Sequence, residues 1–304
     1  MRGRVASACR YRDAAPLRER EGEAVGGLFR LQAYGEVLST TEIVKHAIEE
    51  GEPEGLAVGA RVQTAGYGRQ GRAWSSPDGG MYLSLLLRPR CALSQLPTLS
   101  LVAGVAVRRA IASVSREGAA DRVRLKWPND VVCSPASRCD GAGGGELSAA
   151  LPGRGSEGAP APFGKLAGIS LESHAGGICV GVGVNVSAAS RPRISSGKYA
   201  PAYVSELSSD DVTVEGVRDA VLAQFETCYG RWLEQGFAAF ADEYRSHSAL
   251  GGRIVTVENV DGSFVAQGRV EGVDASGCLL VRGDGADEPM HLSSGEVHLS
   301  RIGG

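Results

Sequence analysis

Three glycines and two arginines are gathered in one stretch, GYGRQGRAW, at residues 66–74. The G-x-G-x-x-G spacing is that of a dinucleotide-binding fingerprint, which lies between a strand and a helix and needs an acidic residue about 20 positions later. Residues 58–64 can form the strand, but a Pro-Asp-Gly turn follows the loop, and no carboxylate occurs between Asp78 and Glu117. The sequence therefore argues against a nicotinamide site.

The same loop suits phosphate chemistry of another kind. Arg69 and Arg72 carry forked guanidinium groups that form charge-assisted hydrogen bonds with phosphate oxygens. The glycines let the backbone approach a ligand closely. An exposed Gly-Arg turn without a ligand is the alternative for the loop taken alone.

A second polar group follows a strand expected at residues 123–127. Lys126, Asn129 and Asp130 all lie within the sequence LKWPND. Magnesium prefers a few oxygen ligands plus substrate phosphates, so Asn129 and Asp130 could hold a nucleotide-bound metal while Lys126 offsets phosphate charge. A plain turn after Pro128 with a solvated lysine is the alternative.

Two later strands carry single polar residues. Lys165 precedes Leu-Ala-Gly, and the missing side chain at Gly168 would let a ligand lie along the strand. Asn185 stands in VGVGVNVS, where a buried amide needs hydrogen-bond partners. A lysine that happens to neighbour a glycine, and an asparagine in a turn, are the alternatives.

Periodic segments must position these residues. A capping-box pattern begins at Ser39 and opens a short helix, and a Gly-Gly turn joins two strands into a hairpin. Apolar residues at helical spacing between Val217 and Trp232 indicate a core helix that stops at Gly236. The remaining ranges are a helix at 96–114, a buried strand at 80–88, and hairpin strands at 166–171 and 178–186.

Composition narrows the class of protein. The chain has 304 residues and a net charge of -3, so it has no general nucleic-acid footprint. Seven cysteines without a Cys-x-x-Cys pair and five histidines without ligand spacing indicate reduced thiols and no metal centre of their own. No apolar run approaches a membrane span and no secretory signal is present, so we expect a cytoplasmic protein without a membrane partner; the basic amino terminus leaves a transit peptide open.

Four regions are expected along the chain. Residues 1–30 form a loose tail and residues 31–249 the ligand-binding domain, within which a glycine- and proline-rich insertion spans about 134–162. Residues 250–304 have short strands divided by Asp-Gly turns, a pattern typical of a small barrel.

Five blocks, in this order, resemble the successive signatures of the biotin protein ligases: QTAGYGRQGRAW, GGMYLSLLLRP, LKWPNDV, KLAGISLE and GVGVNVS. The sequence STT resembles that family's first substrate contact, and the resemblance spans about residues 31–304. It implies an α+β fold, a mixed β-sheet with flanking helices of the class II aminoacyl-tRNA synthetase-like, biotin/lipoate ligase type, followed by a small SH3-like β-barrel.

The resemblance also implies an activity in two steps. Biotin and ATP with Mg2+ give biotinyl-5'-AMP and pyrophosphate, and biotin then passes to one lysine of a biotin carboxyl carrier protein, of acetyl-CoA carboxylase or a related biotin enzyme. A homodimer stays open. No winged-helix domain fits before residue 31, so DNA binding is not expected.

Roles for individual residues come from the same resemblance. Lys165 and Arg69 would be catalytic, with Lys165 bridging the biotin carboxylate and the α-phosphate, and Asp130 would take the metal with ATP. Trp74 would wall the pocket. The biotin contacts would be Ser39, Thr40, Gln63, Gly68, Arg69, Gln70, Lys165 and Gly168. The ATP contacts would be Arg69, Arg72, Lys126, Asn129 and Asn185.

Three departures from the family pattern stand out. Tyr67 stands where the loop often has arginine, Thr41 where the first contact often ends in asparagine, and the insertion separates two blocks. With one cation fewer, we expect weaker retention of the adenylate. We also expect the glycine-rich loop to be disordered without ligand and to order over the adenylate, since water would hydrolyse it.

The sequence allows two rival functions. A lipoate or octanoyl transferase of the same superfamily is disfavoured by the Trp-Pro-Asn-Asp block and the C-terminal barrel. A regulator that binds biotin without transferring it is disfavoured because Lys165, Arg69 and Asp130 are all present.

Overall fold

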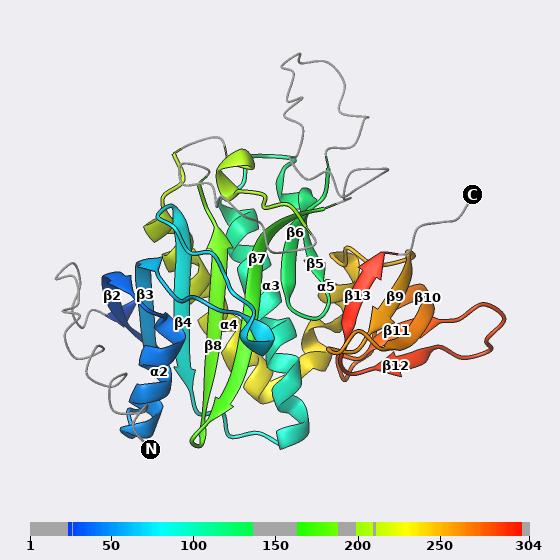
Figure 1. The fold of residues 1–304 in the computed structure, drawn as a ribbon, viewed down its shortest axis with the longest axis horizontal. Coiled ribbons are helices and arrows are strands. Elements are labelled where there is room, and N and C mark those ends of the chain that lie inside the picture. Colours follow the sequence, from blue (N-terminus) through cyan, green and yellow to red (C-terminus); the bar gives the residue numbers. More distant parts are fainter. Residues whose placement is uncertain (1–23, 26, 136–162, 188–198, 209–210, 300–304) are drawn as a thin grey trace, which may run out of the picture.

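A mixed sheet of eight strands forms the centre of the molecule (Figure 1). The computed structural model describes residues 24–25, 27–135, 163–187, 199–208 and 211–299. The strand order is β1-β2-β3-β4-β8-β7-β6-β5, and among these strands only β2 and β3 pair in parallel. The strands are β1 (Ala24–Val25), β2 (Phe29–Val37), β3 (Leu56–Gln63), β4 (Gly80–Leu87), β5 (Val123–Lys126), β6 (Asp130–Cys133), β7 (Gly164–His174) and β8 (Gly177–Asn185).

Helices cover both faces of this sheet, because neighbouring residues of a strand point to opposite sides. Ala57 and Leu85 belong to the core that includes α3 (Leu99–Ser113) and α4 (Val214–Gln235). Their neighbours Val58 and Leu86 belong to the core that includes α2 (Thr40–Glu49). The expected mixed sheet with flanking helices is confirmed. The other helical segments are α5 (Ala241–Ser246), η1 (Arg69–Gly71), η2 (Leu93–Thr98), η3 (Ala120–Arg122), η5 (Val204–Glu206) and η6 (Phe237–Phe240).

The predicted hairpin and core helix are present. Strands β7 and β8 pair antiparallel across a turn in which Ala175 has φ 44° and Gly176 has φ 79°. Positive φ at both central residues is the geometry of a type I′ turn, whose twist matches paired strands. Helix α4 ends at Gly236 with φ 66°, and its apolar stripe is buried as predicted.

The amino-terminal expectations need two corrections. Ser39 is the residue that precedes α2, but its side chain makes no capping hydrogen bond, and the Glu42 side chain, the other half of the expected box, accepts from Tyr67. The predicted tail of residues 1–30 is too long, since β2 begins at Phe29, which is fully buried against Phe225. Residues 1–23 and 26, and most of the expected insertion (136–162), lie outside the described residues.

A second, antiparallel sheet of five strands follows at the carboxyl end, in the order β12-β11-β10-β9-β13. It packs against the first part of the chain: the Trp127 indole donates to the Gly277 carbonyl (3.1 Å). The described pairing runs from β12 to β13 without closing, so an antiparallel sheet is established and a closed barrel is not. Its strands are β9 (Ile254–Glu258), β10 (Phe264–Val273), β11 (Leu279–Arg282), β12 (Met290–Leu292) and β13 (Glu296–Leu299).

One described segment, Leu93–Ser113, is long and apolar enough to cross a membrane by length and composition alone. The expectation that no apolar run approaches that length is therefore wrong for this segment. Val102, Val105 and Ile111, all within it, are fully buried in the core beneath the sheet. The composition thus reflects a helix enclosed by protein on most sides.

Candidate active site

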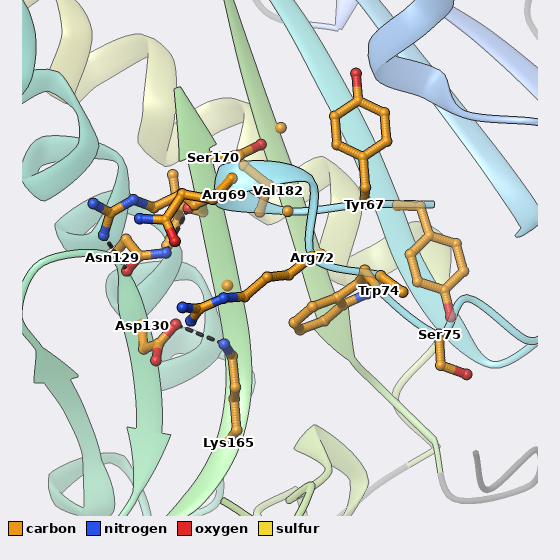
Figure 2. Close-up of a pocket in the computed structure, with 18 of the residues that line it drawn as sticks. Tyr67, Arg69, Arg72, Trp74, Ser75, Asn129, Asp130, Lys165, Ser170 and Val182 are labelled. Carbon is orange, nitrogen blue, oxygen red and sulfur yellow. Dashed lines mark hydrogen bonds and ion pairs between the residues drawn. The ribbon is translucent and has the colours of Figure 1, made fainter. Parts of the chain in front are cut away.

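A cavity of about 430 Å³ opens on the α2 face of the large sheet, beyond the N-terminus of that helix. Ser84 on β4, and Gly181 and Gly183 on β8, line its floor. Because these residues are small, they leave the sheet surface open at the cavity. Further along the same two strands, Leu86 and Cys179 pack against α2. The loop of residues 66–74 covers the cavity (Figure 2).

Segments far apart in the sequence meet at this cavity, as the resemblance requires. One expected residue, Ser39, does not line it: Ser39 is buried at 2% exposure and its hydroxyl has no hydrogen-bond partner among the described residues. The expected residues that do line it are Thr40, Gln63, Gly68, Arg69, Gln70, Arg72, Trp74, Lys126, Asn129, Asp130, Lys165, Gly168 and Asn185.

A carboxylate between two lysines marks one end of the cavity. The Lys165 ammonium lies 2.7 Å from Asp130 Oδ1 (Figure 2). The Lys126 ammonium lies 4.0 Å from Asp130 Oδ2. Lys126 is only 6% exposed, so the alternative of a solvated lysine is wrong. Enclosing the buried Lys126 and the partly buried Lys165 costs free energy unless anions face them, and Asp130 supplies one negative charge. The end therefore has positive charge in excess.

The turn between β5 and β6 links this end to the loop. Arg69 donates to the Asn129 side-chain oxygen (3.0 Å), and the Asn129 amide donates to the Ile169 carbonyl on β7 (2.8 Å). Asn185 lies in β8, not in a turn, and its amide donates to the Lys165 carbonyl (2.9 Å). Burial lowers the pKa of Arg69, against an opposing effect of Asp130, yet an arginine stays protonated at neutral pH.

Trp74 forms a wall of the cavity and lies against two glycines. A Cβ atom at Gly183 would come within 2.8 Å of its indole, and one at Gly168 within 3.1 Å. The Lys165 ammonium lies 5.2 Å from the ring centroid, within range of a cation–π attraction. The indole N–H is buried without an acceptor among the described residues. The glycines on these strands are thus needed for the tryptophan to lie flat.

The opposite end of the cavity is polar and nearly uncharged. The Thr40 backbone N–H donates to the Gln63 side-chain oxygen (2.8 Å), and the Thr40 and Ser84 hydroxyls are 2.8 Å apart. The Thr41 hydroxyl also lies 3.2 Å from the Ser84 hydroxyl. The threonine that replaces the family's usual asparagine therefore has a hydrogen-bond partner here. Hydroxyl and amide groups at a helix N-terminus suit a neutral polar ligand group.

Some lining residues were not expected from the sequence. Glu296 and His298 of β13 line the cavity, and Arg72, which was expected to face phosphates, forms an ion pair with Glu296. No local motif marks Glu296, since its role depends on how the second sheet packs. Gly181 and Gly183 had a readable signal, because two glycines at alternate positions leave one face of a strand bare.

Among the described residues, no group of three or more His, Cys, Asp or Glu side chains could hold a metal ion. The Asp130 carboxylate lies against Lys165, and the Asn129 oxygen accepts from Arg69. These side chains do not build a metal site by themselves, and they fit magnesium only as an ion that arrives with the phosphates of ATP.

Comparison with known proteins agrees with this geometry. A model of the biotin/lipoate A/B protein ligase family matches residues 34–187. The chain belongs to this family. That match contains the loop, both lysines of the charged end and the polar end.

Individual relatives are similar over most of the chain. The biotin--[acetyl-CoA-carboxylase] ligase of Paracoccus denitrificans is 30% identical over 234 residues, covering 74% of this chain and 82% of that protein. The bifunctional ligase/repressor BirA of Bacillus subtilis is 29% identical, covering 82% and 68%. Among solved structures, the biotin protein ligase from Aquifex aeolicus in complex with biotin and ATP matches with a TM-score of 0.69 at 26% identity, covering 89% of this chain and 98% of that one.

Proposed function

We propose that this family member is an ATP-dependent biotin ligase, which activates biotin as biotinyl-5'-AMP and transfers it to a lysine of a biotin carboxyl carrier protein. The observation that carries the proposal is the convergence of Arg69, Lys126 and Lys165 on one cavity with a neutral polar far end. Biotin has the matching shape, with a neutral ureido ring at one end and a carboxylate at the other.

In the first step, a biotin carboxylate oxygen attacks the α-phosphorus of ATP and pyrophosphate leaves. The three cations would stabilise the negative charge on the α-phosphate and the departing pyrophosphate. Lys165 would lie between carboxylate and phosphate, while Thr40 and Gln63 hold the ureido group and Trp74 covers the ring. Holding both reactants in line contributes much of the rate, so no protein nucleophile is needed.

In the second step, the amine of the carrier lysine attacks the acyl carbon of the adenylate, forming an amide, and AMP leaves. Magnesium would enter with ATP and neutralise phosphate charge, with Asp130 as the nearest carboxylate. The five-stranded C-terminal sheet would form an SH3-like domain over residues 250–304 that completes the cavity through Glu296. The enzyme would act in the cytoplasm, where the carrier is made.

The function is tested by weighing the carrier. Purified protein is incubated with ATP, magnesium, a biotin carrier domain and either biotin or lipoate, and the intact mass of the carrier is measured. We expect the carrier mass to rise by one biotinyl group when biotin is supplied and to stay unchanged when lipoate is supplied. The mass should also stay unchanged with biotin when the acceptor lysine of the carrier is replaced by arginine. No gain with biotin would overturn the assignment, and a gain with lipoate alone would make the chain a lipoate ligase.

A further inference from the structure

A cluster of four side chains connects the glycine-rich loop to two other elements. Lys45 of α2 lies 2.5 Å from Glu172 of β7 and donates to the Tyr67 hydroxyl at 2.8 Å. Tyr67 in turn donates to Glu42, one turn before Lys45 on α2. The Lys45 ammonium also lies 5.2 Å from the Tyr67 ring centroid.

The phenol of Tyr67 is a neutral donor in this cluster. Burial and the bond to Glu42 raise the pKa of Tyr67, against the opposing effect of Lys45. Burial lowers the pKa of Lys45, but the bonds to Glu172 and Tyr67 outweigh it and raise the pKa overall. At neutral pH a cation, a phenol and carboxylates therefore face one another, and hydrogen bonds to charged groups are stronger than neutral ones.

The loop transmits the position of Tyr67 to the residues over the cavity. It is a small hairpin in which Tyr67 is paired with Ala73, the Trp74 N–H donates to the Gly66 carbonyl (2.9 Å), and the Gly68 N–H donates to the Arg72 carbonyl (2.9 Å). Fixing one strand of so short a hairpin fixes the other. Figure 2 shows Tyr67 pointing away from the Asp130–Lys165 pair, so its hydroxyl serves the loop and not the charged end.

We propose that Tyr67 is a positioning residue, which ties the loop to Glu42 and Lys45 on α2 and so holds Trp74 and Arg69 over the bound adenylate. The proposal rests on the proposed function, and it goes beyond it by assigning adenylate retention to a side chain that departs from the family pattern. It also modifies the expectation of a disordered free loop: the tether keeps the loop partly closed before ligand binds, and opening is the step that Tyr67 opposes.

The decisive variant is Tyr67→Phe in the full chain, which removes the hydroxyl and keeps the ring. The matched control is Tyr34→Phe, which removes the hydroxyl of a buried tyrosine that bonds to Gln32 outside the cavity. Lys45→Met should reproduce part of the effect of Tyr67→Phe, because it leaves the bond from Tyr67 to Glu42, and Lys45→Arg should retain most of the tether because it keeps a cationic donor.

Two measurements separate this idea from the function itself. Without ligand, trypsin cleavage after Arg69 and Arg72, followed by mass spectrometry, should be at least about tenfold faster in Tyr67→Phe, as expected for losing a hydrogen bond to a charged group. After biotin and ATP are added, the release of preformed adenylate should accelerate by a similar factor.

Each outcome bears on one claim. If the wild-type protein forms no adenylate, the proposed function fails, while the cleavage of the free protein still tests the tether. The tether is wrong if the adenylate forms but Tyr67→Phe behaves like wild type and Tyr34→Phe in both measurements, the rate of trypsin cleavage in the loop and the rate of adenylate release. If cleavage and release accelerate equally in Tyr34→Phe and Tyr67→Phe, the substitutions have a general effect on folding, and the proposed tether is also overturned.

Discussion

At the scale of single residues, the two glycines beneath Trp74 decide whether the cavity has a wall. Gly183 tolerates no added atom, because a Cβ there would lie 2.8 Å from the indole, well inside contact distance. We therefore expect Gly183→Ala to displace Trp74 and weaken biotin binding, at a cost of about 1–3 kcal/mol, or roughly 5- to 150-fold in affinity.

Titration calorimetry with biotin checks this expectation, and the control is a glycine whose surroundings leave room for a Cβ atom. Gly230 on α4 has nothing within 4 Å of its added Cβ, so Gly230→Ala should leave biotin affinity unchanged and stabilise the helix by up to about 1 kcal/mol. Wild-type affinity in Gly183→Ala would mean that Trp74 does not wall the biotin site.

At the scale of elements, the loop of residues 66–74 should respond to ligand. It has one 3₁₀ turn at its tip, where Gln70 adopts a φ of 60°, and Arg72 is exposed. Arg69 and Arg72 are expected to face phosphates, so bound adenylate adds charge-assisted bonds that oppose opening.

Trypsin should therefore cut wild-type protein after Arg69 and Arg72 at least several-fold more slowly with biotin plus ATP than without them. Biotin alone should protect less, because it brings no phosphate. Equal cutting under all conditions would contradict a loop that closes over its ligand.

The elements were predictable where local pattern determines them. Helix α4 follows from its apolar spacing. The β7–β8 hairpin was also predicted, although its turn is centred on Ala175 and Gly176 and not on the Gly176-Gly177 pair. The capping box at Ser39 was wrong: Ser39 makes no capping hydrogen bond, and the Glu42 side chain accepts from Tyr67, which lies 25 positions away. The Tyr67 cluster and the Arg72–Glu296 ion pair join residues from different elements, so only the order of the strands and the packing of the second sheet bring them together.

At the scale of the whole molecule, the second sheet is part of the site and is held tightly to the first. Gly277 of the turn before β11 lies against α3, and an added Cβ would approach Leu101 to 2.8 Å. The carbonyl of Gly277 accepts from the Trp127 indole, which begins the turn carrying Asn129. The packing at Gly277 therefore supports both the core and the charged end.

Gly277→Ala should destabilise this packing beyond the strain of its backbone. Gly277 has φ 83°, and Gly285, with φ 73°, has a similar conformation but nothing within 4 Å of an added Cβ. Gly285→Ala thus measures the cost of positive φ alone. We expect Gly277→Ala to lower the free energy of unfolding by about 1–3 kcal/mol more than Gly285→Ala, as chemical denaturation would show. Because Gly277 accepts from Trp127 at the turn that carries Asn129, only Gly277→Ala should also weaken ATP binding. Equal effects of the two variants on ATP binding would mean that the second sheet is not coupled to the site.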